Sequence, residues 1–590
     1  MLDKGTLEGK IITRRAFIIG AGKVGLLVLL ACRLFYMQFI KKDEYKTLSD
    51  KNRISIILIP PARGQIYDAK NIIIARNQPC LKLFLDKNGN PEYPDEVLLI
   101  SKILELDEDQ VSEVNARIKK GGRKIPVMII DYLDWQQVAV IEEKKHELIS
   151  IFIDTGYARA YPLGKAASHL LGYMAKPQKQ QKNSGITDEN FKVGRSGVEE
   201  YYDDYLRGEF GHKQIEVNAF GKYVRGLARS DSIAGSDLKL HIDSTLQNKV
   251  MPMLSTQGAS AIVMDCANGA VLSLSSSPGF DPNNFENLSA KYWQSLIDNP
   301  YKPLINKTIH SMYPPGSIFK VITFLAALAQ GFDPNIKFTC AGQSMLGGNS
   351  FRCASRRGHG TINMLEAIKF SCNIYVFEIA KIIGAVPIME MAKKFGFGVK
   401  TGIDLKGEQC GFVPSMDWKK ERHSTRWTIG DTLNLAIGQG FLLSTPLQIA
   451  RFITAIASNG KLFTPKINQN RKTEFSSINI REEYLNFIKQ GFYEVVNSPG
   501  GTGYYSRLNT DGIKMAGKTG TSQVQAKLNA DDDLSRANIA WHRRNHAIFA
   551  GYAPFEKPKY SVSVYYDHGG GGGKNAAPIA RDIMHEVLGG

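Results

Sequence analysis

The longest largely apolar stretch of the chain lies near the N-terminus, at residues 16–40. It is long enough to span a bilayer as one helix, and four basic residues precede it. Lys23 and Arg33 interrupt the stretch, at a cost that falls when their side chains reach an interface. Because basic residues favour the cytoplasmic side, we predict a cytoplasmic tail at 1–15, a membrane helix at 16–40 and export of the remainder.

Two other signals overlap this stretch. Residues 13–17 resemble a twin-arginine export signal, and residues 29–32, which end in Cys32, resemble a lipoprotein cleavage box. Either signal would still carry the rest of the chain out of the cytoplasm.

Residues 41–235 mix short strand patterns with helical ones. Ile54–Ile59 has the composition of a strand, and an isoleucine-rich hairpin follows Gly64. Charged helical stretches are predicted near 107–120 and 136–147. Because no catalytic pattern occurs here, we interpret 41–235 as a structural or interaction domain, which we call the pedestal.

Residues 236–590 form the last predicted domain, after a linker at Gly235-Ser236. Strand patterns come first, helical patterns fill the middle, and strand patterns return at the end. The expected strands are 238–242, 259–265, 270–274, 513–521, 546–552 and 560–566. This order predicts an α+β fold in which helices pack on an antiparallel sheet.

Composition narrows the class of partner. The chain has 590 residues, 43% of them hydrophobic, and a net charge of +17, so it is globular and basic. A basic surface favours an acidic partner, namely nucleic acid, an anionic membrane or an anionic polymer. Since no nucleic-acid recognition motif is present, we expect no nucleic-acid partner.

The first chemical motif lies at Ser317. The segment Tyr313-Pro314-Pro315-Gly316 forces a turn, and the apolar run that follows predicts a buried helix beginning at Ser317. Ser317 and Lys320 then share a helix face, beside free N–H groups at the helix N-terminus. A hydroxyl, an amine and amide donors are the components of an acyl-transfer site.

Two further motifs follow in order. Ser371-Cys372-Asn373 lies between helical stretches at 364–370 and 374–383. Lys518-Thr519-Gly520-Thr521 lies in a predicted edge strand, where an extended peptide could pair as an added strand. Ser-x-x-Lys, Ser-x-Asn and Lys-Thr-Gly in this order form the motif set of penicillin-binding proteins and class A β-lactamases.

Three of the seven cysteines form a candidate metal site. Cys340, Cys353 and Cys372 bracket His359 in the sequence. Three thiolates and an imidazole make a closed tetrahedral zinc shell. The alternatives are buried thiols or a Cys340–Cys353 disulfide, with His359 as an ordinary loop residue.

On these motifs, the chain from about residue 60 to its end resembles the class B penicillin-binding proteins of the cell-elongation type. The matching segments include Arg63–Asp68, Arg159–Pro162, Gly194–Glu199, Ser311–Ser317, Gly438–Gly440, Ala516–Gln523 and His568–Gly570. The resemblance implies a serine-type D,D-transpeptidase of the bacterial inner membrane that cross-links peptidoglycan stem peptides in elongation and rod-shape maintenance. It also implies a target of β-lactams and no glycosyltransferase domain.

The resemblance implies a role for each motif residue. Ser317 attacks the donor peptide, Lys320 is the base, and Ser371 relays a proton. Asn373 holds the substrate amide, and Lys518, Thr519, Gly520 and Thr521 bind the terminal carboxylate side of the peptide. Backbone N–H groups of Ser317 and Thr521 form the oxyanion hole. The chemistry needs no cofactor.

The resemblance also bears on metal and partners. Some family members carry a structural zinc in this region, and their ligands match Cys340, Cys353, His359 and Cys372. The expected partners are a SEDS-type glycan polymerase and the elongation complex, bound through the membrane helix and the pedestal.

Two other functions use the same features. A β-lactam sensor or hydrolase shares the motifs, but a sensor should carry a cytoplasmic signalling domain and a hydrolase turns the drug over. A non-catalytic scaffold would keep its function after Ser317→Ala.

Overall fold

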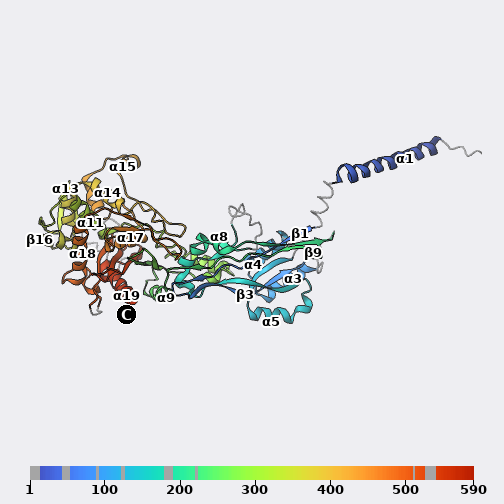
Figure 1. Cartoon of the computed structure of the whole chain (residues 1–590), viewed down its shortest axis with the longest axis horizontal. Helices are drawn as coiled ribbons and strands as arrows, with labels where there is room; N and C mark the ends of the chain where they lie inside the picture. The colour runs from blue at the N-terminus through green and yellow to red at the C-terminus, as the bar shows by residue number, and fades with distance from the viewer. Residues whose placement is uncertain are drawn as a thin grey trace, which may run out of the picture.

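The computed structural model describes residues 14–42, 54–87, 92–120, 126–177, 191–218, 223–254, 256–286, 288–508, 512–524 and 540–589. The molecule is elongated, with helix α1 (Arg14–Phe35) at one end and the C-terminal domain at the other (Figure 1). Together with the short η1 (Tyr36–Ile40), α1 gives an apolar helix over Phe17–Ile40 with mean hydropathy 2.0. Within the described ranges, this is the one helix long and apolar enough to cross a membrane.

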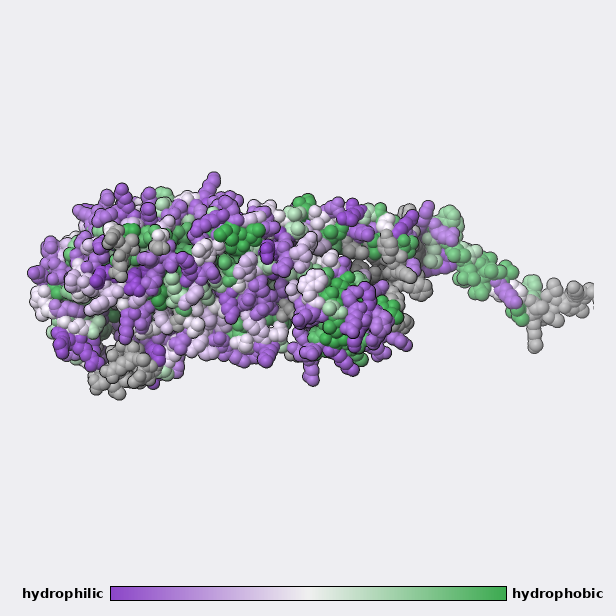
Figure 2. Space-filling view, turned by 90° about the horizontal axis from the view of Figure 1, so that it is seen from below, coloured by the Kyte–Doolittle hydropathy of each residue, from purple (hydrophilic) through white to green (hydrophobic). Residues whose placement is uncertain are grey.

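The hydropathy of the surface also fits α1 as a helix that crosses a membrane. The projecting N-terminal helix is mostly green in Figure 2, whereas the body is mostly purple and white with smaller green patches. None of the apolar window of this helix is buried in the protein. Its hydrophobic side chains therefore face outward, which a lipid environment accommodates and water does not.

The described part of the pedestal contains two larger sheets, besides a short pair formed by β6 Met174–Ala175 and β7 Val193–Gly194. The first has the order β1-β8-β9, and the second has the order β10-β2-β3-β4, with β5 pairing on β3. The strands are β1 Ile54–Ile59, β2 Ile66–Tyr67, β3 Ile73–Leu85, β4 Val127–Leu133, β5 Ile151–Ala160, β8 Gly211–Val217, β9 Tyr223–Ser230 and β10 Leu238–Lys239. The helices are α3 Tyr93–Ile103, α4 Glu108–Lys120, α5 Trp135–Glu143, α6 Ser168–Leu171, α7 Gly197–Tyr201 and α8 Asp203–Arg207.

The C-terminal domain is built on a five-stranded antiparallel sheet of order β12-β11-β21-β20-β19. Its strands are β11 Ala259–Asp265, β12 Val271–Ser277, β19 Ala516–Ser522, β20 His546–Ala553 and β21 Tyr560–Tyr566. Helices α9 Ser244–Met253, α17 Pro446–Ala457, α18 Glu482–Asn497 and α19 Ala577–Val587 pack on these strands. The α+β class predicted from the order of elements is therefore confirmed.

Most of the remaining helices form a lobe beside β19. They are α11 Lys320–Ala329, α12 Met364–Lys369, α13 Asn373–Ile383, α14 Ala385–Lys394, α15 Met416–His423 and α16 Ile429–Ala436. Helix α10 Ala290–Ile297 lies apart, with Leu296 packed against Phe280 and Phe285. Short hairpin strands complete the lobe: β13 Phe338–Cys340, β14 Gln343–Leu346, β15 Asn349–Arg352 and β16 Gly360–Ile362. From Lys320 to Leu328 every residue of α11 is buried, as its unbroken apolar run predicts.

The structure differs from the sequence prediction at the start of the last domain. The sequence predicts that strand 238–242 belongs to the C-terminal sheet, but Leu238 and Lys239 pair in parallel with β2 of the pedestal. One hydrophobic cluster joins Ile66 and Leu238 to Ile262 of the C-terminal sheet. Alternation alone identifies a strand but not its neighbour, because pairing depends on which apolar face is left to cover.

Candidate active site

Ser317 lies in a single 3-10 turn, Gly316–Ile318, immediately before α11. The sequence predicted a regular helix from Ser317, and the structure replaces its first turn with this tighter one. Gly316 has φ +57°, and its N–H donates to the Gly438 carbonyl at 2.9 Å. A Cβ on Gly316 would lie 2.7 Å from the Thr521 carbonyl oxygen. Only glycine allows the turn to approach β19 this closely.

Lys320 joins the first motif to the second. Its Nζ donates to the Ser371 carbonyl at 2.7 Å, to Ser371 Oγ at 3.2 Å and to Asn373 Oδ1 at 2.5 Å. The side chain is 1% exposed. Burial disfavours the ammonium and lowers the pKa of Lys320 to about 8, so about a tenth of the amine is neutral at pH 7.

Ser371 has a strained backbone. The φ of Ser371 is +54°, in the left-handed region that serine rarely adopts. Ser371 is buried and lies between α12 and α13. Cys372 follows as the N-cap of α13, so Asn373 begins that helix. This sharp corner turns the Ser371 hydroxyl and the Asn373 amide toward Lys320, and strain of this kind is typical of functional sites.

The third motif lies on β19, which is an edge strand of the sheet as predicted. Lys518 is fully buried, and burial followed by repulsion from Lys320 holds its pKa well below the ordinary value. For Lys320, burial is the cause that lowers the pKa. Thr519 shares a 2.6 Å hydrogen bond with Thr502, and Thr521 Oγ1 accepts from the Gly572 N–H at 3.3 Å.

Two residues outside the three motifs also contact β19. Thr502 lies in an irregular segment 17 positions before Thr519. Gln439, from the Gly-Gln-Gly segment, donates through Nε2 to the Thr521 carbonyl at 3.5 Å. Both act by packing against β19, which only the tertiary arrangement brings about.

The four predicted metal ligands come together beside the second motif. The ligand atoms of Cys340, Cys353, His359 and Cys372 all lie within 4.8 Å of one another. Cys340 Sγ and Cys353 Sγ lie 3.6 Å and 3.5 Å from His359 Nδ1, and Cys353 Sγ lies 3.9 Å from Cys372 Sγ. A tetrahedral zinc with ordinary bond lengths requires sulfur–nitrogen and sulfur–sulfur separations of about 3.5 Å and about 3.8 Å.

The donor set therefore fits a tetrahedral thiophilic metal. Cys340 and Cys353 are free thiols, so the alternative of a disulfide between them is wrong. The cluster also contacts the catalytic motif, because the Asn373 N–H donates to Cys353 Sγ at 3.4 Å and Asn373 Nδ2 donates to the Arg352 carbonyl at 2.8 Å.

Comparison with known proteins agrees with this geometry. Residues 259–585 match the family described as penicillin binding protein transpeptidase domain, and residues 58–240 match the penicillin-binding protein dimerisation domain. The peptidoglycan D,D-transpeptidase MrdA of Acinetobacter baumannii is 32% identical over 99% of this chain and 88% of its own length. MrdA of Escherichia coli K12 is 28% identical over 99% of this chain and 94% of its own length.

Solved structures give the same result. The penicillin-binding protein PBP2 of Helicobacter pylori, solved in complex with MreC, superposes with a TM-score of 0.80 at 28% identity and covers 91% of this chain and 99% of its own. The chain belongs to the penicillin-binding protein transpeptidases, and the family resemblance predicted from its motifs is confirmed.

Proposed function

We propose that this enzyme, a serine-type D,D-transpeptidase by its family, cross-links peptidoglycan stem peptides with Ser317 as nucleophile during cell elongation. The observation that carries the proposal is the amine of Lys320, held by Ser371 and Asn373 one helical turn from Ser317. Opposite this amine lies the edge strand with Lys518, so a hydroxyl, a low-pKa amine and a peptide-binding edge converge.

The acyl-enzyme forms in one addition and one elimination. Neutral Lys320 takes the Ser317 proton as Oγ attacks the carbonyl that joins two terminal D-alanines. The tetrahedral intermediate then breaks its C–N bond, and Ser371 relays a proton from Lys320 to the departing D-alanine nitrogen. An amine of a second stem peptide attacks the ester and forms the cross-linking amide as the bond to Ser317 Oγ breaks, and the proton lost by the amine passes through Lys320 to Ser317 Oγ.

Binding of the donor peptide uses β19. An extended peptide can add to its open edge, since β19 is hydrogen-bonded to β20 on the other side. Lys518, Thr519 and Thr521 bind the terminal carboxylate, Gly520 lets the peptide backbone approach, and Asn373 holds a substrate amide. The N–H groups of Ser317 and Thr521 receive the oxyanion.

Covalent labelling tests the nucleophile. The full chain is incubated with benzylpenicillin beside a Ser317→Ala variant, and intact mass is recorded over time. We expect a stable adduct that the variant lacks, because β-lactams acylate the same hydroxyl. Drug consumption without a lasting adduct would identify a hydrolase, and an unlabelled wild-type chain would favour the scaffold.

We further propose that Cys340, Cys353, His359 and Cys372 hold a structural zinc. The distances among their ligand atoms support it. The metal takes no part in the reaction; it would fix the corner at Cys372 and so the two motif residues on either side of it. Metal analysis of purified native protein tests this, and protein free of zinc would refute it.

The same family supports a location and partners. We propose residues 1–15 as a cytoplasmic tail, 16–40 as the inner-membrane anchor, 41–235 as the periplasmic pedestal and 236–590 as the transpeptidase domain. Because the Helicobacter pylori relative was solved with MreC, an MreC-type protein and a SEDS-type polymerase of the elongation complex are the proposed partners. Membrane fractionation and co-purification with either protein test these assignments.

A further inference from the structure

We propose that Tyr504, Tyr505 and Arg507 form the binding site for the acceptor stem peptide, and that Arg507 receives a carboxylate of that peptide. The inference rests on the proposed transpeptidase reaction and gives its second substrate a place. The three residues lie in and beside the 3-10 turn η7 (Tyr504–Ser506), which follows α18 and precedes β19 in the sequence. We call these three residues the acceptor platform.

The chemistry of the second step determines the side from which an acceptor approaches. The acceptor amine forms a bond to the acyl carbon as the bond to Ser317 Oγ breaks, and its proton passes through Lys320 to that oxygen. By microscopic reversibility, the amine arrives along the path by which the D-alanine nitrogen departed. The proposed carboxylate site of that D-alanine is at Thr519 and Thr521. The acceptor therefore reaches the ester from the Thr519 side of the cleft.

A direct contact joins the segment of the platform to this side of the cleft. Thr502 Oγ1 and Thr519 Oγ1 share a hydrogen bond of 2.6 Å, and Thr502 is exposed. Tyr505 follows Thr502 by three positions in the sequence. Three residues of extended chain span at most about 11 Å, which limits the distance between the two Cα atoms. The platform thus borders the place where the departing carboxylate binds.

The segment that carries the platform is anchored at its start. The Thr502 N–H donates to the Lys369 carbonyl at 3.4 Å. The Gly503 N–H donates to the Val495 carbonyl, in the last turn of α18, at 3.0 Å. A Cβ on Gly573 would lie 2.2 Å from the Thr502 carbonyl oxygen, so the glycine-rich loop after β21 packs directly on this residue. A segment held in this way binds a peptide with less loss of conformational entropy than a free loop.

The guanidinium of Arg507 is oriented before any ligand binds. Its Cζ lies 4.2 Å from the centroid of the Tyr504 ring, and its Nη1 donates to the Tyr504 carbonyl at 3.0 Å. Arg507 is exposed, and within the described ranges no carboxylate pairs with it. A stacked guanidinium keeps its remaining N–H groups for an anion, and it can bind a carboxylate through two parallel hydrogen bonds.

Tyr505 supplies the apolar part of the platform. Its exposed fraction, 89%, is the largest of any large hydrophobic residue in the described part of the chain, and its ring lies 5.7 Å from that of Tyr504. Single exposed rings are common, but this one lies beside a cation at the border of the cleft. Tyrosine offers a peptide a wide flat surface at little cost in side-chain entropy. A peptide with an amine and a carboxylate can therefore pack on Tyr505 and pair with Arg507.

Partition of the acyl-enzyme tests the proposal. The full chain is acylated with a D-alanyl thioester, and the aminolysis and hydrolysis products are measured against the concentration of a synthetic stem tripeptide that ends in a diamino acid. The same tripeptide with its carboxylates amidated is the second acceptor. The variants are Arg507→Ala, Arg507→Lys, Tyr505→Ala and Tyr505→Phe. Acylation by benzylpenicillin, which involves no second peptide, is recorded for each.

Arg481→Ala is the matched control. Arg481 is also exposed and also lies over a tyrosine ring, with its Cζ 5.6 Å from the Tyr484 centroid. It immediately precedes α18, whereas the platform follows that helix. The 16 residues of α18 span about 24 Å, so the control removes the same kind of contact far from the cleft.

We expect Arg507→Ala to raise the acceptor concentration at half-saturation about tenfold, as loss of one partly exposed charge-assisted contact should, with Arg507→Lys intermediate. The wild type with the amidated acceptor should match Arg507→Ala with the ordinary one. Amidation should cost the variant nothing further, because both changes remove the same interaction. Tyr505→Ala should weaken both acceptors, and Tyr505→Phe and Arg481→Ala neither. The losses should fall on aminolysis and not on acylation.

Three results would overturn the proposal: half-saturation of Arg507→Ala at the wild-type concentration, a loss in that variant that amidation of the acceptor multiplies, or acylation by benzylpenicillin that slows as much as aminolysis does. The last result would assign Arg507 to the donor. Failure of the proposed function is distinct, because the wild type would then form no aminolysis product, or Ser317→Ala would still be acylated, and either result would remove both proposals.

Discussion

At the scale of the residue, burial changes what an ordinary lysine can do. Lys320 lies in an apolar helix and contacts three neutral oxygens rather than a carboxylate. Its charge loses water on burial, and this loss outweighs the attraction of Cys353 and Cys372, so the pKa is lowered to about 8. Lys518 experiences the same burial and, in addition, repulsion from Lys320. A substrate carboxylate beside Lys518 would favour the charged form of this amine, which its proposed role in binding an anion requires.

The first prediction concerns the pH dependence of acylation. A group with a lowered pKa is neutral above that pKa, so the rate should rise with pH and level off above about 8. Lys320→Ala should lose about 100- to 10,000-fold in rate, with a flat profile through this region. Stopped-flow acylation of both forms decides the matter: near-normal acylation by the variant would make another group the base.

The second prediction concerns the metal ligands. Cys353→Ser should remove bound zinc, lower the melting temperature and slow acylation, because the Asn373 N–H donates to this sulfur. Cys266→Ser is the matched control, since Cys266 is also a buried thiol but lies outside the cluster. Zinc content by mass spectrometry is the readout. Equal zinc content in the two variants would contradict the assignment.

At the scale of the element, the site depends on how closely three elements approach. The 3-10 turn at Gly316–Ile318 lies against β19, and the corner between α12 and α13 lies against α11. Each approach uses an unusual backbone: φ is +57° at Gly316 and +54° at Ser371. Close packing of these elements, more than the helical spacing, brings Ser317, Lys320 and the Lys518 strand together.

The third prediction tests this approach with two glycines. Gly316→Ala should destabilise the fold by more than the roughly 1–2 kcal/mol of left-handed strain and slow acylation more than tenfold, because its Cβ would meet Thr521. Gly331 has φ +82° and no atom within 4 Å of the position of a Cβ, so Gly331→Ala should be destabilised by the left-handed backbone strain only. The two variants are compared by chemical denaturation and by their acylation rates. Similar losses in both would show that the contact with β19 is unimportant.

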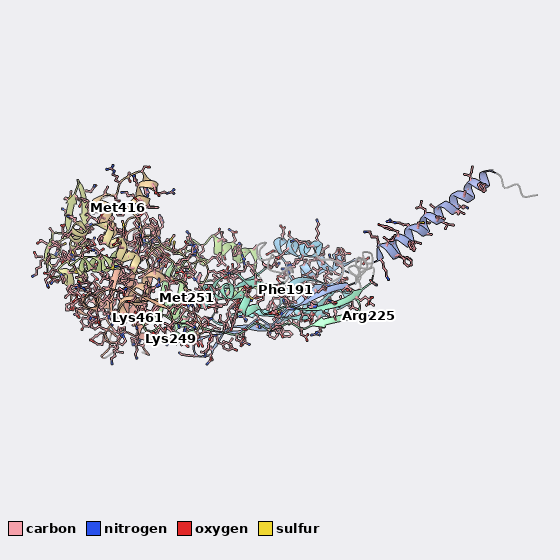
Figure 3. The ribbon with its side chains drawn as sticks, turned by 45° about the horizontal axis from the view of Figure 1, so that its top comes forward. Phe191, Arg225, Lys249, Met251, Met416 and Lys461 are labelled. Atoms are coloured by element: carbon pink, nitrogen blue, oxygen red, sulfur yellow. The ribbon has the colours of Figure 1, made fainter. Side chains whose placement is uncertain are left out.

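At the scale of the whole molecule, the transpeptidase domain lies at the end far from the apolar N-terminal helix α1 (Figure 1). Figure 3 labels Arg225 on the pedestal strand β9, on the side of α1, and Met416 at the start of α15 on the far domain. The two domains share the cluster that includes Ile66 and Ile262. The pedestal thus continues directly into the catalytic domain through a packed interface.

The fourth prediction concerns this interface. The Tyr202 hydroxyl of the pedestal donates to Asp404 Oδ2 of the catalytic domain at 2.7 Å, and Asp404 is 1% exposed. Tyr202→Phe should lower the stability of the joined domains by roughly 1–3 kcal/mol, the value of a hydrogen bond to a charged group. Tyr201→Phe, whose side chain is exposed, should change little. Calorimetry of the full chain measures both, and equal melting profiles would argue against this contact as a domain link.

The sequence by itself determined the local elements and the identity of the motifs. The apolar run after Gly316 required a buried helix, and strand alternation placed β11, β20 and β21 within a residue of their observed ends. These signals are local, because side-chain period and turn residues act over a few positions. The family followed from three motifs in a fixed order, and the comparisons confirm it.

Only the tertiary structure decided which strands, segments and side chains are neighbours. Strand 238–239 pairs with the pedestal, and Thr502 and Gln439 reach β19. The structure also set the charge states, since burial of Lys320 and Lys518 depends on the layers around them. Long-range contacts and desolvation belong to the packed core as a whole, and no local pattern of residues encodes them.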